Sequence, residues 1–107
     1  MLPITDESFE KKIREPQKLI IVDFWAKWCS PCKSFLPIIE CVSKDLDKNT
    51  EVFSMDIDVS SETPSKYGVR SIPTLMIFKN KEHLDTRSGI MTKSELLSWI
   101  KGWQNIK

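Results

Sequence analysis

The sequence is poor in cysteine, histidine and glycine, and it carries almost no net charge. Three cysteines are too few for the disulfide scaffold of a small secreted domain. The 16 lysines and arginines are balanced by 15 aspartates and glutamates, which leaves a net charge of +1. This balance predicts no basic surface, and therefore no binding to nucleic acid.

The sequence also lacks long apolar segments. No apolar run approaches the roughly 20 residues that a membrane-spanning helix needs, so we expect no association with a membrane. Residues 1–6 have neither the basic nor the apolar region of a signal peptide. A chain of 107 residues has the length of one domain with its own core. We therefore expect a single domain over residues 1–107, located in the cytoplasm.

What the sequence does contain is a regular succession of strand and helix patterns. Alternating or continuous apolar residues predict strands, and an apolar period of 3.6 predicts helices. Strands are expected over residues 2–4, 18–26, 52–59, 74–78 and 82–87, and helices over residues 6–15, 31–48, 61–67 and from 92 onward. This order predicts a mixed α/β fold of three layers, with helices on both faces of one sheet.

The expected strand over residues 18–26 is apolar on both faces, which is typical of a central strand covered by helices on both sides. Asp23 interrupts its apolar run. We expect this carboxyl to be buried, with its pKa raised by the loss of water. A carboxyl of this kind can accept a proton from a neighbouring thiol. The alternative is a buried carboxyl with no role beyond its hydrogen bonds.

Two cysteines stand between this strand and the next helix, where residues 28–32 read Trp-Cys-Ser-Pro-Cys. Cys-x-x-Cys in this context predicts a redox pair rather than a metal site. Cys29 lies at the start of the helix, where free N–H groups and the helix dipole lower the pKa of a thiol. We therefore expect Cys29 to be the exposed nucleophile and Cys32 the resolving thiol. A zinc half-site is the alternative, but Cys41 and His83, the remaining candidate ligands, are distant in the sequence.

Cys41 is placed away from the redox pair. It lies about half a turn round the helix from Cys32 and roughly 13 Å along it, too far to form a disulfide without unfolding the helix. Because it is off the apolar stripe, we expect it to be partly exposed and without a role, with a regulatory thiol as the alternative. His83, on a polar edge strand, is expected to be a surface residue.

Three features together resemble the thioredoxin family. They are the order of strands and helices, the Trp-Cys-Ser-Pro-Cys phrase, and residues 67–74, which read Tyr-Gly-Val-Arg-Ser-Ile-Pro-Thr. The resemblance covers essentially the full length and implies the thioredoxin fold, with a central mixed five-stranded sheet whose middle strand carries Asp23. The family usually has glycine where Ser30 stands, and many bacterial members have lysine where Ser54 stands. Without that cation, the pKa of Asp23 is expected to be higher still.

The resemblance also implies roles around the cysteine pair. It makes Asp23 the proton acceptor for Cys32. It implies a cis peptide bond before Pro73, which would leave the backbone of Ile72 open to pair with an extended substrate.

The resemblance further implies that Asp58 holds the indole of Trp28, whereas we expect Trp25 to support the core. The family's docking surface corresponds here to seven residues, Trp28, Ser30, Pro31, Ile72, Pro73, Gly89 and Ile90.

The activity implied is that of a protein-disulfide reductant recharged by a thioredoxin reductase. Electrons would be carried by the Cys29–Cys32 disulfide, with no other cofactor and no metal. The expected partners are that reductase and protein disulfides, and we expect a monomer. A second interpretation is a disulfide oxidase or isomerase on the same fold, although such proteins often have histidine where Pro31 stands. A third is a thioredoxin-like binding subunit in which the thiols are secondary.

Overall fold

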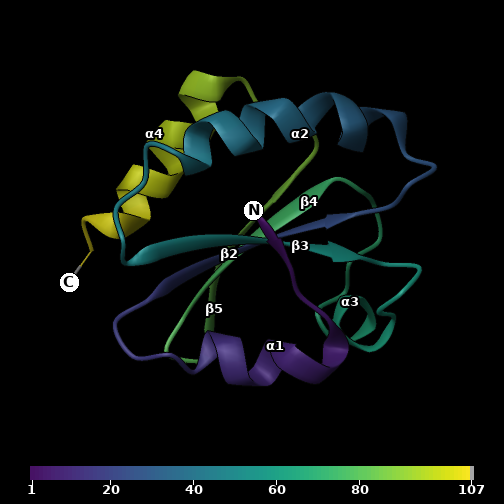
Figure 1. Cartoon of the computed structure of the whole chain (residues 1–107), viewed down its shortest axis with the longest axis horizontal. Helices are drawn as coiled ribbons and strands as arrows, with labels where there is room; N and C mark the ends of the chain where they lie inside the picture. Colours follow the sequence, from purple (N-terminus) through teal and green to yellow (C-terminus); the bar gives the residue numbers. More distant parts are fainter. Residues whose placement is uncertain (107) are drawn as a thin grey trace.

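The computed structural model describes residues 1–106, which form five strands and four helices (Figure 1). In chain order these are β1 (Leu2–Pro3), α1 (Asp6–Ile13), β2 (Leu19–Trp25), α2 (Ser30–Ser43), β3 (Thr50–Asp56), α3 (Glu62–Lys66), β4 (Thr74–Lys79), β5 (Glu82–Ser88) and α4 (Lys93–Gln104). The predicted succession of elements is confirmed.

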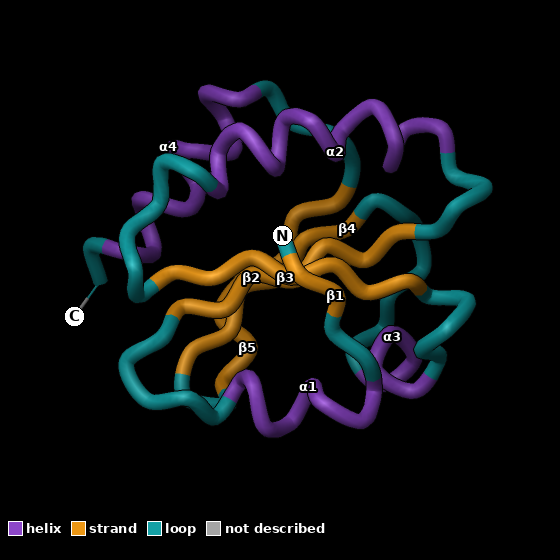
Figure 2. The backbone as a smooth tube through the Cα atoms, in the orientation of Figure 1, coloured by secondary structure: helices purple, strands orange, loops and turns teal. Residues whose placement is uncertain are grey.

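The strands form one mixed sheet in the order β1-β3-β2-β4-β5 (Figure 2). β1, β3 and β2 run parallel to one another, whereas β4 is antiparallel to both β2 and β5. β2 is therefore the central strand, as predicted, and it carries Asp23.

Apolar residues on both faces of β2 join the sheet to its helices. Ile21 belongs to a buried cluster with Phe35 of α2 and Leu96 of α4. Val22 points to the opposite face and belongs to a second buried cluster, with Phe9 of α1. Figure 1 shows the result: α2 and α4 cover one face of the sheet, and α1 and α3 the other. The three-layer prediction is confirmed.

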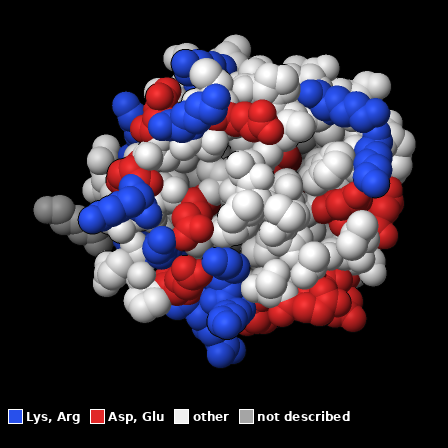
Figure 3. Space-filling view, viewed as in Figure 1, with Lys and Arg blue, Asp and Glu red and all other residues white. Residues whose placement is uncertain are grey.

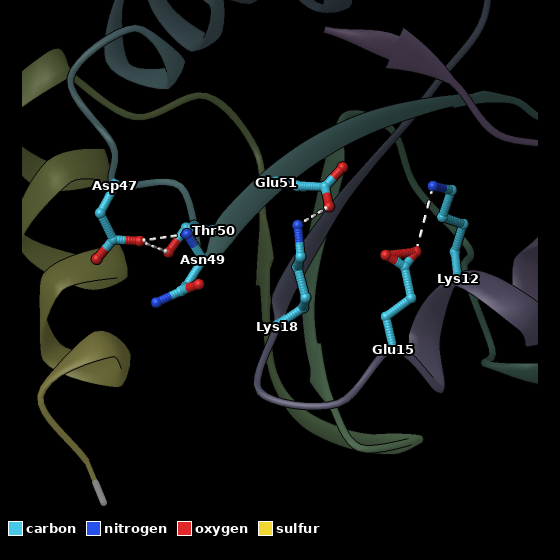
Figure 4. Close-up of polar contacts among 7 residues, drawn as sticks. All are labelled: Lys12, Glu15, Lys18, Asp47, Asn49, Thr50 and Glu51. Carbon is cyan, nitrogen blue, oxygen red and sulfur yellow. Dashed lines mark hydrogen bonds and ion pairs between the residues drawn. The ribbon is translucent and has the colours of Figure 1, made fainter.

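The predicted helix over residues 31–48 ends earlier than expected, at Ser43. Directly after it the chain makes a tighter turn, in which the Asp45 N–H donates to the Val42 carbonyl at 2.9 Å. A polar turn before β3 follows, in which the Asp47 side chain accepts hydrogen bonds from the Asn49 N–H at 2.9 Å and the Thr50 hydroxyl at 3.2 Å (Figure 4). Such local bonds offer the backbone an alternative to the helix. β3 then starts at Thr50, two residues before the predicted position.

The strand predicted over residues 52–59 extends too far at its C-terminal end. β3 stops at Asp56, whose carbonyl accepts from the N–H groups of Val59 and Ser60 in a turn. Val59, the last residue of the predicted strand, is consequently outside β3 and 72% exposed. The first helix likewise ends at Ile13, two residues before the predicted boundary.

Side-chain hydrogen bonds fix the outer helices. Asp85 of β5 accepts from the indole N–H groups of Trp99 and Trp103 at 2.7 and 3.0 Å, which ties α4 to the sheet. Asp6, at the start of α1, accepts from the backbone N–H and the hydroxyl of Thr63 at 2.8 and 2.7 Å. This aspartate therefore caps the first turn of α3 and joins it to α1.

Charges of both signs are mixed on the face shown in Figure 3, in keeping with the net charge of +1. Lys18 and Glu51, for example, form an ion pair at 2.8 Å between the starts of β2 and β3 (Figure 4). Among the described residues, no helix has the length and apolar character that crossing a membrane requires.

Candidate active site

Cys29 and Cys32 form a disulfide at the start of α2, with their Cα atoms 5.3 Å apart. Cys29 is the N-cap of the helix, and its sulfur accepts a hydrogen bond from the backbone N–H of Cys32 at 3.2 Å. Pro31 fits in the first turn because a residue there needs no backbone donor. A free N–H and the positive end of the helix dipole therefore lie at the Cys29 sulfur, where they would stabilise a thiolate.

The expected exposure of Cys29 is wrong for the disulfide form. Cys29 is only 4% exposed and Cys32 3%. Both sulfurs are covered because the pair packs against Trp25 and Ile72. The Cys29 sulfur lies 3.9 Å from the carbonyl oxygen of Ile72. The loop that carries Ile72 therefore covers this sulfur.

Asp23 is buried as predicted, with 2% of its surface exposed. It shares a face of β2 with Ile21 and Trp25, since side chains alternate along a strand. Burial raises the pKa of Asp23 to about 7. One of its carboxylate oxygens, Oδ1, has no hydrogen-bond partner among the described residues. Because Ile21 packs against α2 and Trp25 against the disulfide cluster, Asp23 lies on the face of the sheet that α2 and its cysteine pair cover.

Ser54 lies beside Asp23, at the register position expected from the resemblance. The two residues are paired across the parallel strands β2 and β3, and Leu75 of β4 flanks Asp23 on the other side. No cation is supplied by either neighbouring position.

Trp28 is 68% exposed, and its indole N–H donates to Asp58 at 2.9 Å, as expected. The peptide bond between Ile72 and Pro73 is cis, also as expected. Trp25, by contrast, is half-buried and packs against the disulfide cluster, in keeping with a supporting position.

The other residues expected on the docking surface lie around the same sulfurs. Ser30 and Pro31 are exposed in the first turn of α2. The Gly89 N–H donates to the carbonyl of Pro73 at 2.8 Å, which places the segment after β5 against the cis-proline loop. Ile90, the next residue, is exposed. Pro73, expected on this surface, is buried, because the segment after β5 lies against its loop. The structure therefore brings the predicted residues together, with Pro73 beneath the surface, without testing their roles.

A groove of about 310 Å³ adjoins this surface, and sequence reasoning missed part of it. Trp28, Ile57 and Ile72 form its apolar lining, and Arg70 and Ser71 also border it. Arg70 and Ser71 could have been found from the sequence, because they fall within residues 67–74, the segment that carries the family resemblance. No spacing rule, however, connects these two residues with Trp28.

The two residues considered as alternative metal ligands lie elsewhere. Cys41 is free and exposed on α2, as expected. His83 is exposed on β5, where it hydrogen-bonds the Thr86 hydroxyl at 2.7 Å. Within residues 1–106, no group of three or more histidine, cysteine or acidic side chains is arranged to hold a metal ion.

Comparison with known proteins agrees with this geometry. The thioredoxin family model matches residues 1–102. A thioredoxin from Rickettsia bellii is 52% identical over 97 residues, which cover 91% of this chain and 92% of that protein. A thioredoxin from Rhodospirillum rubrum is 41% identical over 101 residues (94% of this chain and 97% of that protein), and one from Pseudomonas aeruginosa is 40% identical over 97 residues (91% and 90%). With its Cys29–Cys32 pair at the start of α2, the chain belongs to the thioredoxin family and is a thiol–disulfide oxidoreductase.

Proposed function

We propose that this protein is a general reductant of protein disulfides, recharged by a thioredoxin reductase. The observation that carries the proposal is the position of Cys29 as the sulfur cap of α2, with the buried and partly unpaired Asp23 on the strand that leads into this helix. Such a site can stabilise one thiolate at the helix end and accept a proton from the second thiol.

The reaction follows from these positions. In the dithiol form, the Cys29 thiolate attacks one sulfur of a client disulfide, and the client's other sulfur leaves as a thiolate. Asp23 then accepts the proton of Cys32. The Cys32 thiolate attacks the sulfur of Cys29, and the bond between Cys29 and the client breaks. The client gains two electrons, and the protein is left with the Cys29–Cys32 disulfide, which the reductase reduces again.

The surface around the sulfurs suits an extended client segment. The exposed indole of Trp28 and the groove beside it offer apolar contact. The Ile72 backbone lies beside the Cys29 sulfur, where a client strand would pair with it by β-augmentation. Gly89 and Ile90, which lie against the loop of the buried Pro73, extend this surface, as do Ser30 and Pro31 in the first turn of α2.

A reductant of this kind acts in a reducing compartment, and we propose the cytoplasm. The proposal further holds that the protein is a monomer and that its only redox group is its own cysteine pair. Clients and the reductase are its proposed partners.

The first test is the reduction potential of the Cys29–Cys32 pair, followed by tryptophan fluorescence in dithiothreitol buffers. A value near −270 mV, which is about the general value for thioredoxins, supports the reductant. A value above about −200 mV would contradict it and identify a disulfide oxidase or isomerase on this fold.

The second test is the reduction of a protein disulfide by NADPH and thioredoxin reductase. We expect Cys29→Ser and Cys32→Ser to lose turnover, and Cys41→Ser, the matched control, to keep the wild-type rate. If the double variant lacking both Cys29 and Cys32 kept full biological function, the protein would instead be a binding subunit.

A further inference from the structure

The buried carboxyl of Asp23 has one polar neighbour in the sheet. Along β2 it is flanked by Val22 and Phe24, and across the sheet it is paired with Leu75 and Ser54. Of these four residues, all within the described part of the chain, only Ser54 has a polar side chain. Any hydrogen-bonded connection from Asp23 to solvent within the sheet therefore starts at Ser54.

Ser54 faces a cavity of about 220 Å³ between β1, β2 and β3. Trp25, which lies two residues after Asp23 on the same face, also lines this cavity. The lining further includes Pro3 and Val59, both exposed. The cavity therefore extends from solvent to the residue beside the buried carboxyl.

The cavity has the properties that a water site requires. A water needs roughly 10–15 Å³ and two to four polar partners, and four of the lining residues, Thr5, Ser54, Asp56 and Ser60, have polar side chains. Neighbouring strands are about 4.8 Å apart. One water can bridge side chains at that separation, because each of its hydrogen bonds spans about 2.8 Å. The unpartnered Oδ1 of Asp23 is a carboxylate oxygen available to accept such a bond.

We propose that Ser54 is a positioning residue, which holds water between this cavity and Asp23 and so provides the route by which the proton of the resolving step reaches solvent. The inference rests on the proposed role of Asp23 as the proton acceptor for Cys32. The proton passes from the Cys32 thiol to the Asp23 carboxylate, then from the Asp23 carboxyl to the water held by Ser54, and from there through the cavity to bulk water. Asp23 is left as a carboxylate, ready for the next cycle.

Few other ionisable groups lie on the elements around Asp23 and Ser54. Cys32 of α2 is the proton donor of the step, and Asp56 lies two residues beyond Ser54 on the same face of β3. Leu75 on β4 and Pro3 on β1 are not ionisable. Because the two nearby carboxyls carry charge of the same sign, Asp56 cannot replace hydration by Ser54 as a stabiliser of the Asp23 carboxylate.

The test compares Ser54→Val, which has no hydroxyl, with Ser54→Thr, which has nearly the same shape as valine and keeps a hydroxyl. The Asp23 carboxyl is titrated by ¹³C NMR in the disulfide form, and the resolving step is timed against pH by rapid quench of a mixed disulfide on Cys29. We expect the Val variant to raise the pKa of Asp23 by about one pH unit, since desolvation disfavours the charged form. Its rate profile should shift by the same amount, and the Thr variant should behave as wild type.

Ser34→Val, on the exposed face of α2, is the matched control and should change neither curve. An unchanged Asp23 titration in the Ser54→Val variant would overturn the proposal, because the cavity would then not hydrate the carboxyl. A shifted titration with an unshifted rate profile would also overturn it, by showing that Asp23 does not take the proton. The reduction potential of the cysteine pair decides the reductant assignment separately from either result.

Discussion

Replacing Asp23 by asparagine is expected to stabilise the protein, and the gain should depend strongly on pH. The pKa of this carboxyl is about 7 in the folded protein, against a usual value of 3.8, because burial disfavours its charged form. At about 1.36 kcal/mol for each pH unit, that difference corresponds to about 4 kcal/mol of free energy of unfolding. Asparagine has nearly the same shape as protonated aspartate and never ionises, so the variant avoids this cost.

The sign follows from proton binding. Between pH 3.8 and about 7, the folded protein keeps the proton on Asp23, whereas the unfolded chain releases it. The free energy of unfolding of the wild type therefore falls as pH rises through this window and stays level above it. The variant lacks this dependence. The difference between the two proteins should be near zero at pH 4 and approach about 4 kcal/mol at pH 8.

Urea unfolding of the disulfide form, followed by tryptophan fluorescence from pH 4 to pH 9, measures this difference. Asp45→Asn, at an exposed position, is the matched control and should show no such trend. A stability difference between wild type and Asp23→Asn that stays constant with pH would refute the reasoning, because it would mean that the carboxyl is ionised or hydrated equally in both states.

Two further predictions concern the carboxylates that hold the helices. Burial alone would raise the pKa of Asp6, but hydrogen bonds from Thr63 outweigh it and lower the pKa; Asp6→Ala should therefore cost about 1 kcal/mol above pH 3.8, and the cost should shrink below that pH. A pH-independent loss in urea unfolding would contradict this. Asp85→Ala leaves the indole N–H groups of Trp99 and Trp103 without their acceptor, at about 1–3 kcal/mol each if they stay buried. The expected result is a lower urea midpoint and a red-shifted tryptophan emission, and unchanged emission would show that the two indoles keep their environment without Asp85.

The order of elements and the cysteine pair could be predicted from the sequence because their signals are local. The double-sided apolar run of β2 indicates a central strand wherever the rest of the chain lies, so the burial of Asp23 followed directly. The place of Cys29 between a strand and a helix likewise determined its position as the cap of α2.

What could not be predicted depends on contacts between distant segments or on local competition. The chain leaves α2 at Ser43 and enters the Asp47 turn that precedes β3, and apolar periodicity does not register such a turn. The burial of the Cys29 sulfur comes from Ile72, 43 residues away. The cavity beside Ser54 needs β1, β2 and β3 in register before it exists.

The sulfur cap of α2 has a consequence for recognition. The N–H of Cys32 already points at the Cys29 sulfur in the disulfide, and the same donor binds a thiolate there more strongly. Gaining two electrons therefore leaves the helix end with the same hydrogen bond, and the outline that it presents to partners need not change. Under the proposed function, a client binds the dithiol form and the reductase binds the disulfide form. These two partners would then recognise their form chiefly by the charge on a single atom rather than by a change of shape.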